Sequence, residues 1–550
     1  MSVDPNTPGT NPAPDGATTA AGGGPEGAGA EDATATGGAA LSEHATTIRD
    51  AYAFPGTRIH LGALIEPAPS GDPQPGAPVH LALSMLNRHG LIAGATGTGK
   101  TKTLQVIAEQ VAAAGTPVFV ADMKGDLSGI AVPGADSPTI RERAAARGQQ
   151  WEPRAGTTEF YTLGGRGTGV PIRTTVSDFG PTLLAKVLGL NPTQESSLSL
   201  IFHYADQQGL CLLDLKDLRA LVHFLTSDPE GKAELKGIGG VSAATAGVIL
   251  RSLTAFEARG ADAFFGEPAF ETSALLRTAE DGTGIISCLE LPGVAAETTL
   301  FSTFLMWLLA DLYQELPEVG DAEQPKLVFF FDEAHLLFKD ASAAFLEQVT
   351  QTVRLIRSKG VGVVFITQTP KDVPRDVLAQ LGNRVQHALR AYTPEDATSL
   401  RATASTFPVS DLDLTEVLPA LPTGAAVVTV MSEDGAPTPV AVTAVRAPES
   451  SMEPCPPEEM QRIVDTSALL AQYAEVIDRE SAYEKLAARA ETAPASTSTP
   501  PPSAGSEKGS PQAESSGGLM ANPAVKSFLR SAGTVLGREI TRQLFGTRRR

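Results

Sequence analysis

Cysteine is scarce in this chain of 550 residues, and its scarcity limits both the redox compartment and the kind of metal site. The sequence holds three cysteines, which lie far apart at Cys211, Cys288 and Cys455. A disulfide framework or a zinc site needs several such residues at characteristic spacings, so neither is indicated. A reducing cytoplasm therefore fits the chain.

Basic residues are few relative to acidic ones. Lys and Arg number 43 against 63 Asp and Glu, which gives a formal charge of −20. A protein that coats nucleic acid with its whole surface is more often basic. Any contact with a polynucleotide is therefore expected to be local, for instance inside a channel.

Long apolar runs are also missing from the sequence. The best candidate, residues 300–316, is interrupted by Asp311 and Glu315 and predicts a buried helix. The first basic residue is Arg49, and no apolar core precedes it, so the start of the chain does not resemble a secretory signal. We expect no stable insertion into a membrane.

Two stretches of low complexity frame one long folded region. Residues 1–48 are mainly Ala, Gly, Thr and Pro with six carboxylates and no Lys or Arg, a composition typical of disorder. Residues 493–518 read as a linker by composition. Residues 525–550 combine apolar side chains at helical spacing with seven basic residues and one acid. We favour docking of this helix on the protein or on a neighbouring subunit over contact with nucleic acid or an anionic membrane.

Between these stretches, strand-like runs alternate with helical ones, which predicts an α/β fold with a mostly parallel sheet covered by helices. Buried strands are expected at 89–94, 117–122, 326–332 and 362–368, a helix at 102–115, and a closing hairpin through residues 432–438. The expected parts are a disordered tail (1–54), the first part of the core (55–134), a mostly helical insertion with a possible hairpin at 160–173 (135–290), the second part of the core (291–450), a helical extension (451–492), a disordered linker (493–520) and a basic amphipathic helix (521–550).

The run GATGTGKT fits the P-loop pattern at every fixed position and sits between a predicted strand and a predicted helix. Glycines let backbone N–H groups wrap phosphates without a clashing Cβ, and the start of the helix adds its positive end. We expect the lysine to reach the β- and γ-phosphates and the last threonine to offer a hydroxyl to Mg²⁺. The predicted ATP-binding residues are Gly94, Ala95, Thr96, Gly97, Thr98, Gly99, Lys100 and Thr101.

A second motif, KLVFFFDEAH, places two acids at the end of an apolar strand. Asp332 is expected to hold Mg²⁺, and Glu333 to orient and polarise the attacking water. Acids that merely cap a strand would explain one carboxylate but not the adjacent pair. His335 is equally consistent with a nucleotide sensor and with a histidine packed on the next helix.

Polar residues follow two further strands. Gln368 is a candidate to contact the γ-phosphate or the water, and a strand-end amide that bonds the next loop is an equally good interpretation. Asp122, Lys124 and Asp126 lie near the same edge, where they either serve the site or solvate a turn.

An arginine finger from a neighbouring subunit can speed hydrolysis by roughly 10³–10⁵-fold. Arg357 is our first candidate and Arg384 the second, with Arg354 and Arg390 as further possibilities. Positive charge near the helix end at Arg357 is also explained by the helix dipole.

The letters DEAH also mark a class of RNA helicases, but the Ser-Ala-Thr and Gln-x-x-Gly-Arg-x-Gly-Arg motifs of that class do not occur here. The chain instead resembles the HerA/FtsK branch of P-loop ATPases, most closely the bacterial HerA-like group DUF853. The resemblance rests on residues 87–110, 118–131, 326–338, 353–391 and 478–487 and on the basic tail.

This resemblance implies a RecA-like core, assembly into a hexameric ring with ATP between subunits, and movement of a polymer, usually double-stranded DNA. HerA proteins carry an N-terminal β-barrel, for which residues 56–85 are too few. We favour an ATP-driven DNA translocase or helicase. The alternatives are an ATPase that remodels a protein partner and a nucleotide-dependent switch without translocation.

Overall fold

The computed structural model describes residues 40–294, 298–320, 322–339 and 343–492. The described residues from Leu41 onward form one compact unit. Most of the predicted tail, the predicted linker (493–520) and the predicted basic helix (521–550) lie outside the described residues.

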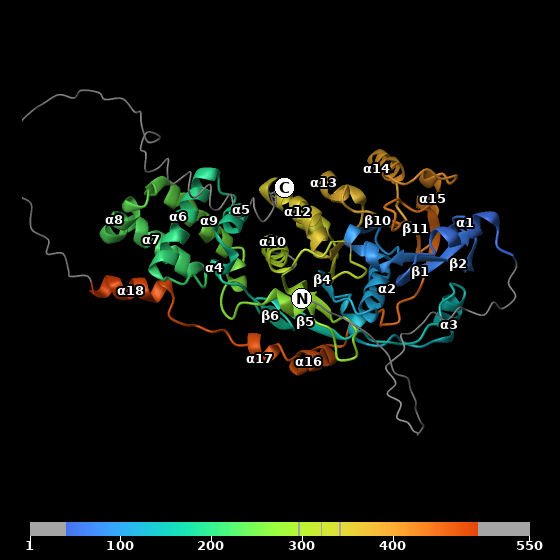
Figure 1. Ribbon diagram of the computed structural model, residues 1–550, viewed down its shortest axis with the longest axis horizontal. Helices are drawn as coiled ribbons and strands as arrows, with labels where there is room; N and C mark the ends of the chain where they lie inside the picture. The colour runs from blue at the N-terminus through green and yellow to red at the C-terminus, as the bar shows by residue number, and fades with distance from the viewer. Residues whose placement is uncertain (1–39, 295–297, 321, 340–342, 493–550) are drawn as a thin grey trace, which may run out of the picture. The chain divides into compact units, whose positions relative to one another are not determined.

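One sheet runs through this unit (Figure 1). Its strands follow the order β2 (Asp72–Ala82), β1 (Arg58–Glu66), β12 (Ala441–Val445), β11 (Ala425–Thr429), β10 (Asn383–His387), β3 (Gly90–Ala93), β9 (Val361–Thr367), β8 (Leu327–Phe331), β4 (Val118–Asp122), β7 (Ile286–Glu290), β5 (Thr158–Leu163) and β6 (Val170–Ile172). All neighbours from β10 to β6 pair in parallel, so the predicted α/β fold with a mostly parallel sheet is confirmed.

The other edge of the sheet is antiparallel. The predicted closing hairpin is confirmed, because β11 and β12 pair antiparallel with Ala425 opposite Ala444. β12 then pairs with β1, and β1 with β2, so the stretch 56–85 adds two strands to this edge.

The prediction of disorder up to residue 54 is wrong in its last part, because Glu43–Ala51 form helix α1. Ser42 caps this helix, accepting a hydrogen bond from a backbone N–H of its first turn. Ile48 and Tyr52 are buried in the same apolar cluster as β1 and β2. The low-complexity composition of the tail predicted disorder, but these few apolar residues pack against the edge of the sheet and stabilise the helix.

The segment 135–290 is only partly the helical insertion that we predicted, because it also supplies β5, β6 and β7 to the sheet. The hairpin predicted at 160–173 is wrong, since β5 and β6 pair in parallel. The glycines of the connecting loop explain the error. Gly164, Gly165 and Gly167 all have positive φ, and the loop brings the chain back so that β6 runs in the same direction as β5. The helices of the segment are α3 (Pro138–Ala145), α4 (Val176–Phe179), α5 (Pro181–Val187), α6 (Pro192–Gln208), α7 (Leu215–Ser227), α8 (Pro229–Gly237) and α9 (Ala243–Glu257).

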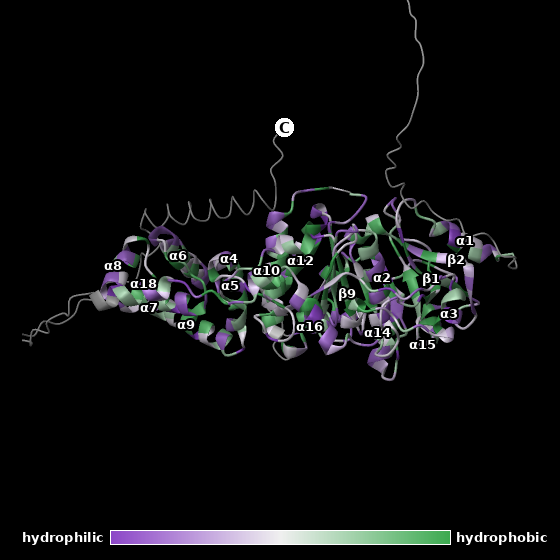
Figure 2. Cartoon of the chain, turned by 90° about the horizontal axis from the view of Figure 1, so that it is seen from below, coloured by the Kyte–Doolittle hydropathy of each residue, from purple (hydrophilic) through white to green (hydrophobic). Residues whose placement is uncertain are grey.

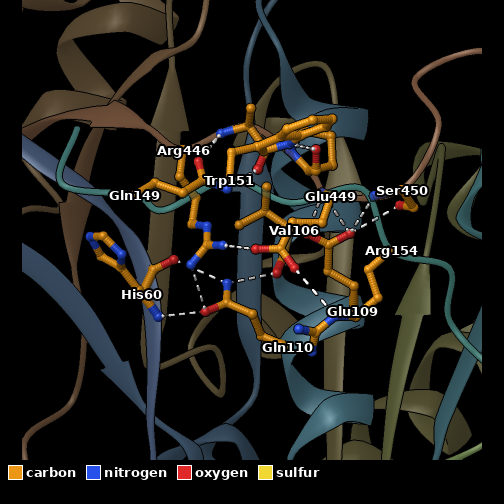
Figure 3. Close-up of polar contacts among 12 residues, drawn as sticks. His60, Val106, Glu109, Gln110, Gln149, Trp151, Arg154, Arg446, Glu449 and Ser450 are labelled. Carbon is orange, nitrogen blue, oxygen red and sulfur yellow. Dashed lines mark hydrogen bonds and ion pairs between the residues drawn. The ribbon is translucent and has the colours of Figure 1, made fainter. Parts of the chain in front are cut away.

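The segment after β12 returns along helix α2 (Lys100–Ala113) and anchors it. Glu109 of α2 accepts hydrogen bonds from the backbone N–H of Glu449 and from the N–H and hydroxyl of Ser450 (Figure 3). Gln105, one turn earlier, donates to the Ser450 hydroxyl at 2.7 Å. Burial raises the pKa of Glu109 to about 7 against the effect of these bonds. Up to residue 492, where the described part ends, three helices follow this segment: α16 (Pro457–Thr466), α17 (Leu470–Tyr473) and α18 (Ala482–Thr492).

Apolar side chains fill both faces of the sheet. Figure 2 shows hydrophobic residues gathered on the strands and on the helices that cover them. Helix α10 (Thr298–Glu315) is buried as predicted, with Phe301, Phe304 and Leu308 in the largest cluster. Within the described ranges, we find no helix with the length and apolar character that crossing a membrane requires.

His89, just before β3, gives the fold a dependence on pH. Its Nδ1 accepts a hydrogen bond from the Val363 N–H at 3.1 Å, and its Nε2 donates to the Val353 carbonyl at 2.7 Å, so the neutral ring is fully used. Burial lowers the pKa of His89 from 6.5 to about 4. The unfolded chain takes up this proton near pH 6.5 and the folded chain only near pH 4. The stabilisation is therefore complete above pH 6.5 and is lost as the pH falls towards 4.

We expect the free energy of unfolding to fall across this window, with His89 contributing about 3 kcal/mol. The His89→Gln variant keeps a donor and an acceptor but does not titrate, so its stability should depend less on pH. Denaturant unfolding between pH 7 and pH 4 measures this, with the exposed His203→Gln as control. Equal pH slopes for wild type and His89→Gln would refute the assignment.

Candidate nucleotide-binding site

The loop between β3 and α2 has the shape that the P-loop prediction requires. The first turn of α2 contains no acidic residue and its N-cap, Gly99, supplies no side-chain hydrogen bond. Its backbone N–H groups are thus available to a ligand, and the helix dipole favours an anion there. Gly94 and Gly99 have φ of 156° and 112°, and a Cβ at Gly94 would lie 2.5 Å from the Cβ of His387. Only glycine fits there.

Lys100 opens helix α2 and folds back onto the loop. Its Nζ donates to the Ala95 carbonyl at 3.1 Å, and the residue is 9% exposed. Burial lowers the pKa of Lys100, while the charges of Glu333 and Asp332 act in the opposite direction. A phosphate would offer the ammonium a stronger acceptor than a backbone carbonyl.

Asp332 and Glu333 directly follow β8 and face the P-loop across one intervening strand. β3, β9 and β8 are parallel neighbours, and Ala93 at the end of β3 is in register with Thr367 at the end of β9. The carboxyl ends of these strands therefore meet at one edge of the sheet. The charges of both acids act on Lys100 there.

Asp332 has the features of a metal ligand. It is 2% exposed, and its Oδ2 is buried and accepts no hydrogen bond from the described residues. Burial, and then the charge of Glu333, raise the pKa of Asp332 to about 7. A divalent cation would bind this oxygen and favour the ionised form of the carboxylate. These features of Asp332 fit a Mg²⁺ ligand, and the hydroxyl of Thr101 stays the predicted second ligand.

Glu333 is strained and surrounded by charge. Its φ of 46° is unusual for a residue other than glycine, a conformation that costs roughly 1–2 kcal/mol. Oε1 forms an ion pair with the Nζ of Lys124, and Oε2 lies 3.1 Å from His335 Nδ1 without the alignment of a hydrogen bond. Burial alone would raise the pKa of Glu333, but the hydrogen bond and charge of Lys124 hold it below its ordinary value. Glu333 is thus kept ionised.

The structure of the loop after β4 distinguishes the roles of its three charged residues, which the sequence left open. Asp122 is structural, because its carboxylate accepts hydrogen bonds from the backbone N–H groups of Lys124, Gly125 and Leu127. Lys124 belongs to the site, since it pairs with Glu333. The charge of Asp126 also acts on Lys100 and Asp332, so Asp126 lies near the site.

Sequence reasoning left the role of Lys124 undecided. The available signal was its position two residues after a buried strand, but only the sheet order shows that β4 is the neighbour of β8.

The remaining candidates lie after β9, before β9 and within β10. Gln368 follows β9 directly and is exposed at the same edge, so its contact with the γ-phosphate stays a prediction. Arg357 lies in the turn before β9, at the other end of that strand. Arg384 lies within β10, where its Nη1 donates to the Thr406 carbonyl at 3.2 Å. As fingers for a neighbouring subunit, both arginines stay predictions.

Comparison with known proteins places these features in one family. The model of the family described as "Helicase HerA-like C-terminal" matches residues 69–550. No curated protein matches the sequence.

Several solved structures resemble the fold at low sequence identity. The bacterial conjugative coupling protein TrwB is 14% identical, with 74% of this chain and 94% of that chain covered and a TM-score of 0.46. TrwB in complex with the ATP analogue ADPNP is 16% identical, covering 73% and 98%, with a TM-score of 0.46. VirB4 of Thermoanaerobacter pseudethanolicus is 15% identical, covering 74% and 99%, with a TM-score of 0.42.

Proposed function

The chain belongs to the family of HerA-like helicase C-terminal proteins, and we propose that it hydrolyses ATP to move along double-stranded DNA as a ring. The observation that carries this proposal is the meeting of the P-loop with an adjacent acidic pair at one edge of the sheet. The narrower assignment to the DUF853 group remains a prediction.

The residues divide the work of hydrolysis among themselves. Lys100 and the N–H groups at the start of α2 bind the phosphates of ATP. Asp332 and Thr101 would hold Mg²⁺, which would neutralise phosphate charge. Glu333 orients the attacking water, and Gln368 senses the terminal phosphate from the end of β9. These roles need two buried acids side by side, which a protein that only binds nucleotide does not require.

Assembly into a hexameric ring is supported by the family and by the position of a candidate arginine finger. Arg357 lies before β9, at the end of that strand opposite to the P-loop edge, as a finger that acts on a neighbour would, whereas Arg384 lies in β10, beside β3. The acidic composition, with a formal charge of −20, is compatible with DNA held inside a channel rather than on the outer surface.

We expect duplex DNA to increase the rate of ATP turnover several-fold, because a translocase couples hydrolysis to its polymer. The measurement is steady-state ATP hydrolysis by the full chain with Mg²⁺, with and without duplex DNA, alongside the mass of the protein in solution. Hydrolysis that ignores DNA would favour a protein-remodelling ATPase or a switch. A strictly monomeric protein in the presence of ATP and Mg²⁺ would contradict the ring.

A further inference from the structure

The ion pair between Lys124 and Glu333 joins two segments that are 209 residues apart in the sequence. Lys124 comes from the loop after β4, and Glu333 from the turn after β8, the neighbouring strand in the sheet. Lys124 binds only one carboxylate oxygen, Oε1, and the opposite oxygen, Oε2, faces His335. The contact therefore fixes the orientation of the carboxylate.

The backbone of Lys124 is itself held in place. The buried carboxylate of Asp122 accepts the N–H of Lys124 at 3.1 Å, that of Gly125 at 2.7 Å and that of Leu127 at 2.8 Å. These three bonds set the shape of the loop after β4. The ammonium of Lys124 thus starts from a rigid base, as precise positioning of a reacting group requires.

Burial is uneven across the pair. The side chain of Glu333 is 5% exposed, whereas that of Lys124 is 50% exposed. A buried carboxylate without a partner is costly, and its side chain would seek another one or turn away. The half-exposed lysine can be replaced without opening the core. Loss of the Lys124 side chain should therefore disturb the position of the Glu333 carboxylate more than the stability of the fold.

We propose that Lys124 is a positioning residue for hydrolysis, which acts through Glu333 and not through the nucleotide. Lys124 holds Oε1 of Glu333 and so fixes the position of the carboxylate that orients the attacking water. The proposal rests on the proposed ATP hydrolysis and adds a residue for which the P-loop and the acidic pair alone give no role.

The test compares Lys124→Met with wild type in ATP hydrolysis and in ATP binding. We expect kcat to fall roughly 10- to 100-fold, because a misplaced reacting group costs about that much. KM and the dissociation constant of ATP should change by less than about threefold, since only a step after binding is affected. Lys124→Arg should recover part of the lost kcat. Lys216→Met, which removes an exposed lysine of α7, is the matched control and should match wild type.

A double variant tests whether Lys124 acts through Glu333. In the Glu333→Gln background, adding Lys124→Met should leave ATP affinity unchanged and cause no further loss of kcat, because the carboxylate to be positioned is gone. Three results would overturn the proposal: weaker ATP binding in either Lys124→Met protein, an additive loss of kcat, or wild-type or higher turnover by the single variant. Absence of turnover in wild type itself would instead sink the proposed function.

Discussion

Replacing Glu333 with glutamine is expected to lower ATP turnover roughly 10²–10⁴-fold while ATP still binds. Glutamine keeps the size of the side chain but removes the charge that orients and polarises water, and such groups contribute roughly 10²–10⁴-fold to rate. The amide also loses the ion pair with Lys124, whose side chain is half-exposed, so that water can solvate its ammonium instead. Phosphate release measures turnover, and a fluorescent ATP analogue measures binding.

The control for this substitution is Glu480→Gln, which removes an exposed carboxylate from the segment between α17 and α18. It should hydrolyse ATP as wild type does. If the Glu333→Gln protein retained more than about a tenth of the wild-type rate, general-base catalysis by Glu333 would be excluded.

Replacing Lys100 with alanine is expected to weaken ATP binding itself. Hydrogen bonds to charged groups contribute about 1.5–3 kcal/mol, which corresponds to roughly 10- to 150-fold in affinity. The loss in stability of the nucleotide-free protein should be small, because the Nζ of Lys100 then donates one hydrogen bond, to the carbonyl of Ala95. Nucleotide titration measures the affinity, and thermal melting without nucleotide measures the stability.

Lys102 provides a matched control on the same helix. It lies two residues further along α2, and its Nζ donates to the carbonyl of Met452 in the segment that anchors the helix. Lys102→Ala should therefore lower the melting temperature of the protein but leave its ATP affinity close to that of wild type. If the Lys100→Ala protein bound ATP as tightly as wild type, the loop before α2 would not be the phosphate site.

The features that sequence predicted well are those encoded within one short segment. The P-loop needs its glycines at fixed spacing, and the short apolar run before Asp332 is typical of a buried strand. The four predicted core strands agree with β3, β4, β8 and β9 to within two residues. That both motifs reach one edge followed from the rule that parallel strands align their carboxyl ends.

The features that sequence missed depend on contacts between distant segments. The glycines after β5 predicted a hairpin, but a turn signal does not fix the direction in which the next strand pairs. Helix α1 was hidden by a low-complexity neighbour, although Ile48 and Tyr52 have a sheet edge to pack on. The role of Lys124 depends on the order of β4 and β8, which no local pattern encodes.

A structure of the full chain with a non-hydrolysable ATP analogue and Mg²⁺ tests the central claim most directly. We expect the terminal phosphates at the start of α2 within hydrogen-bond distance of Lys100, the metal beside Asp332, and Glu333 facing the terminal phosphate. Nucleotide bound elsewhere, or an acidic pair turned away from the phosphates, would contradict this assignment of the site.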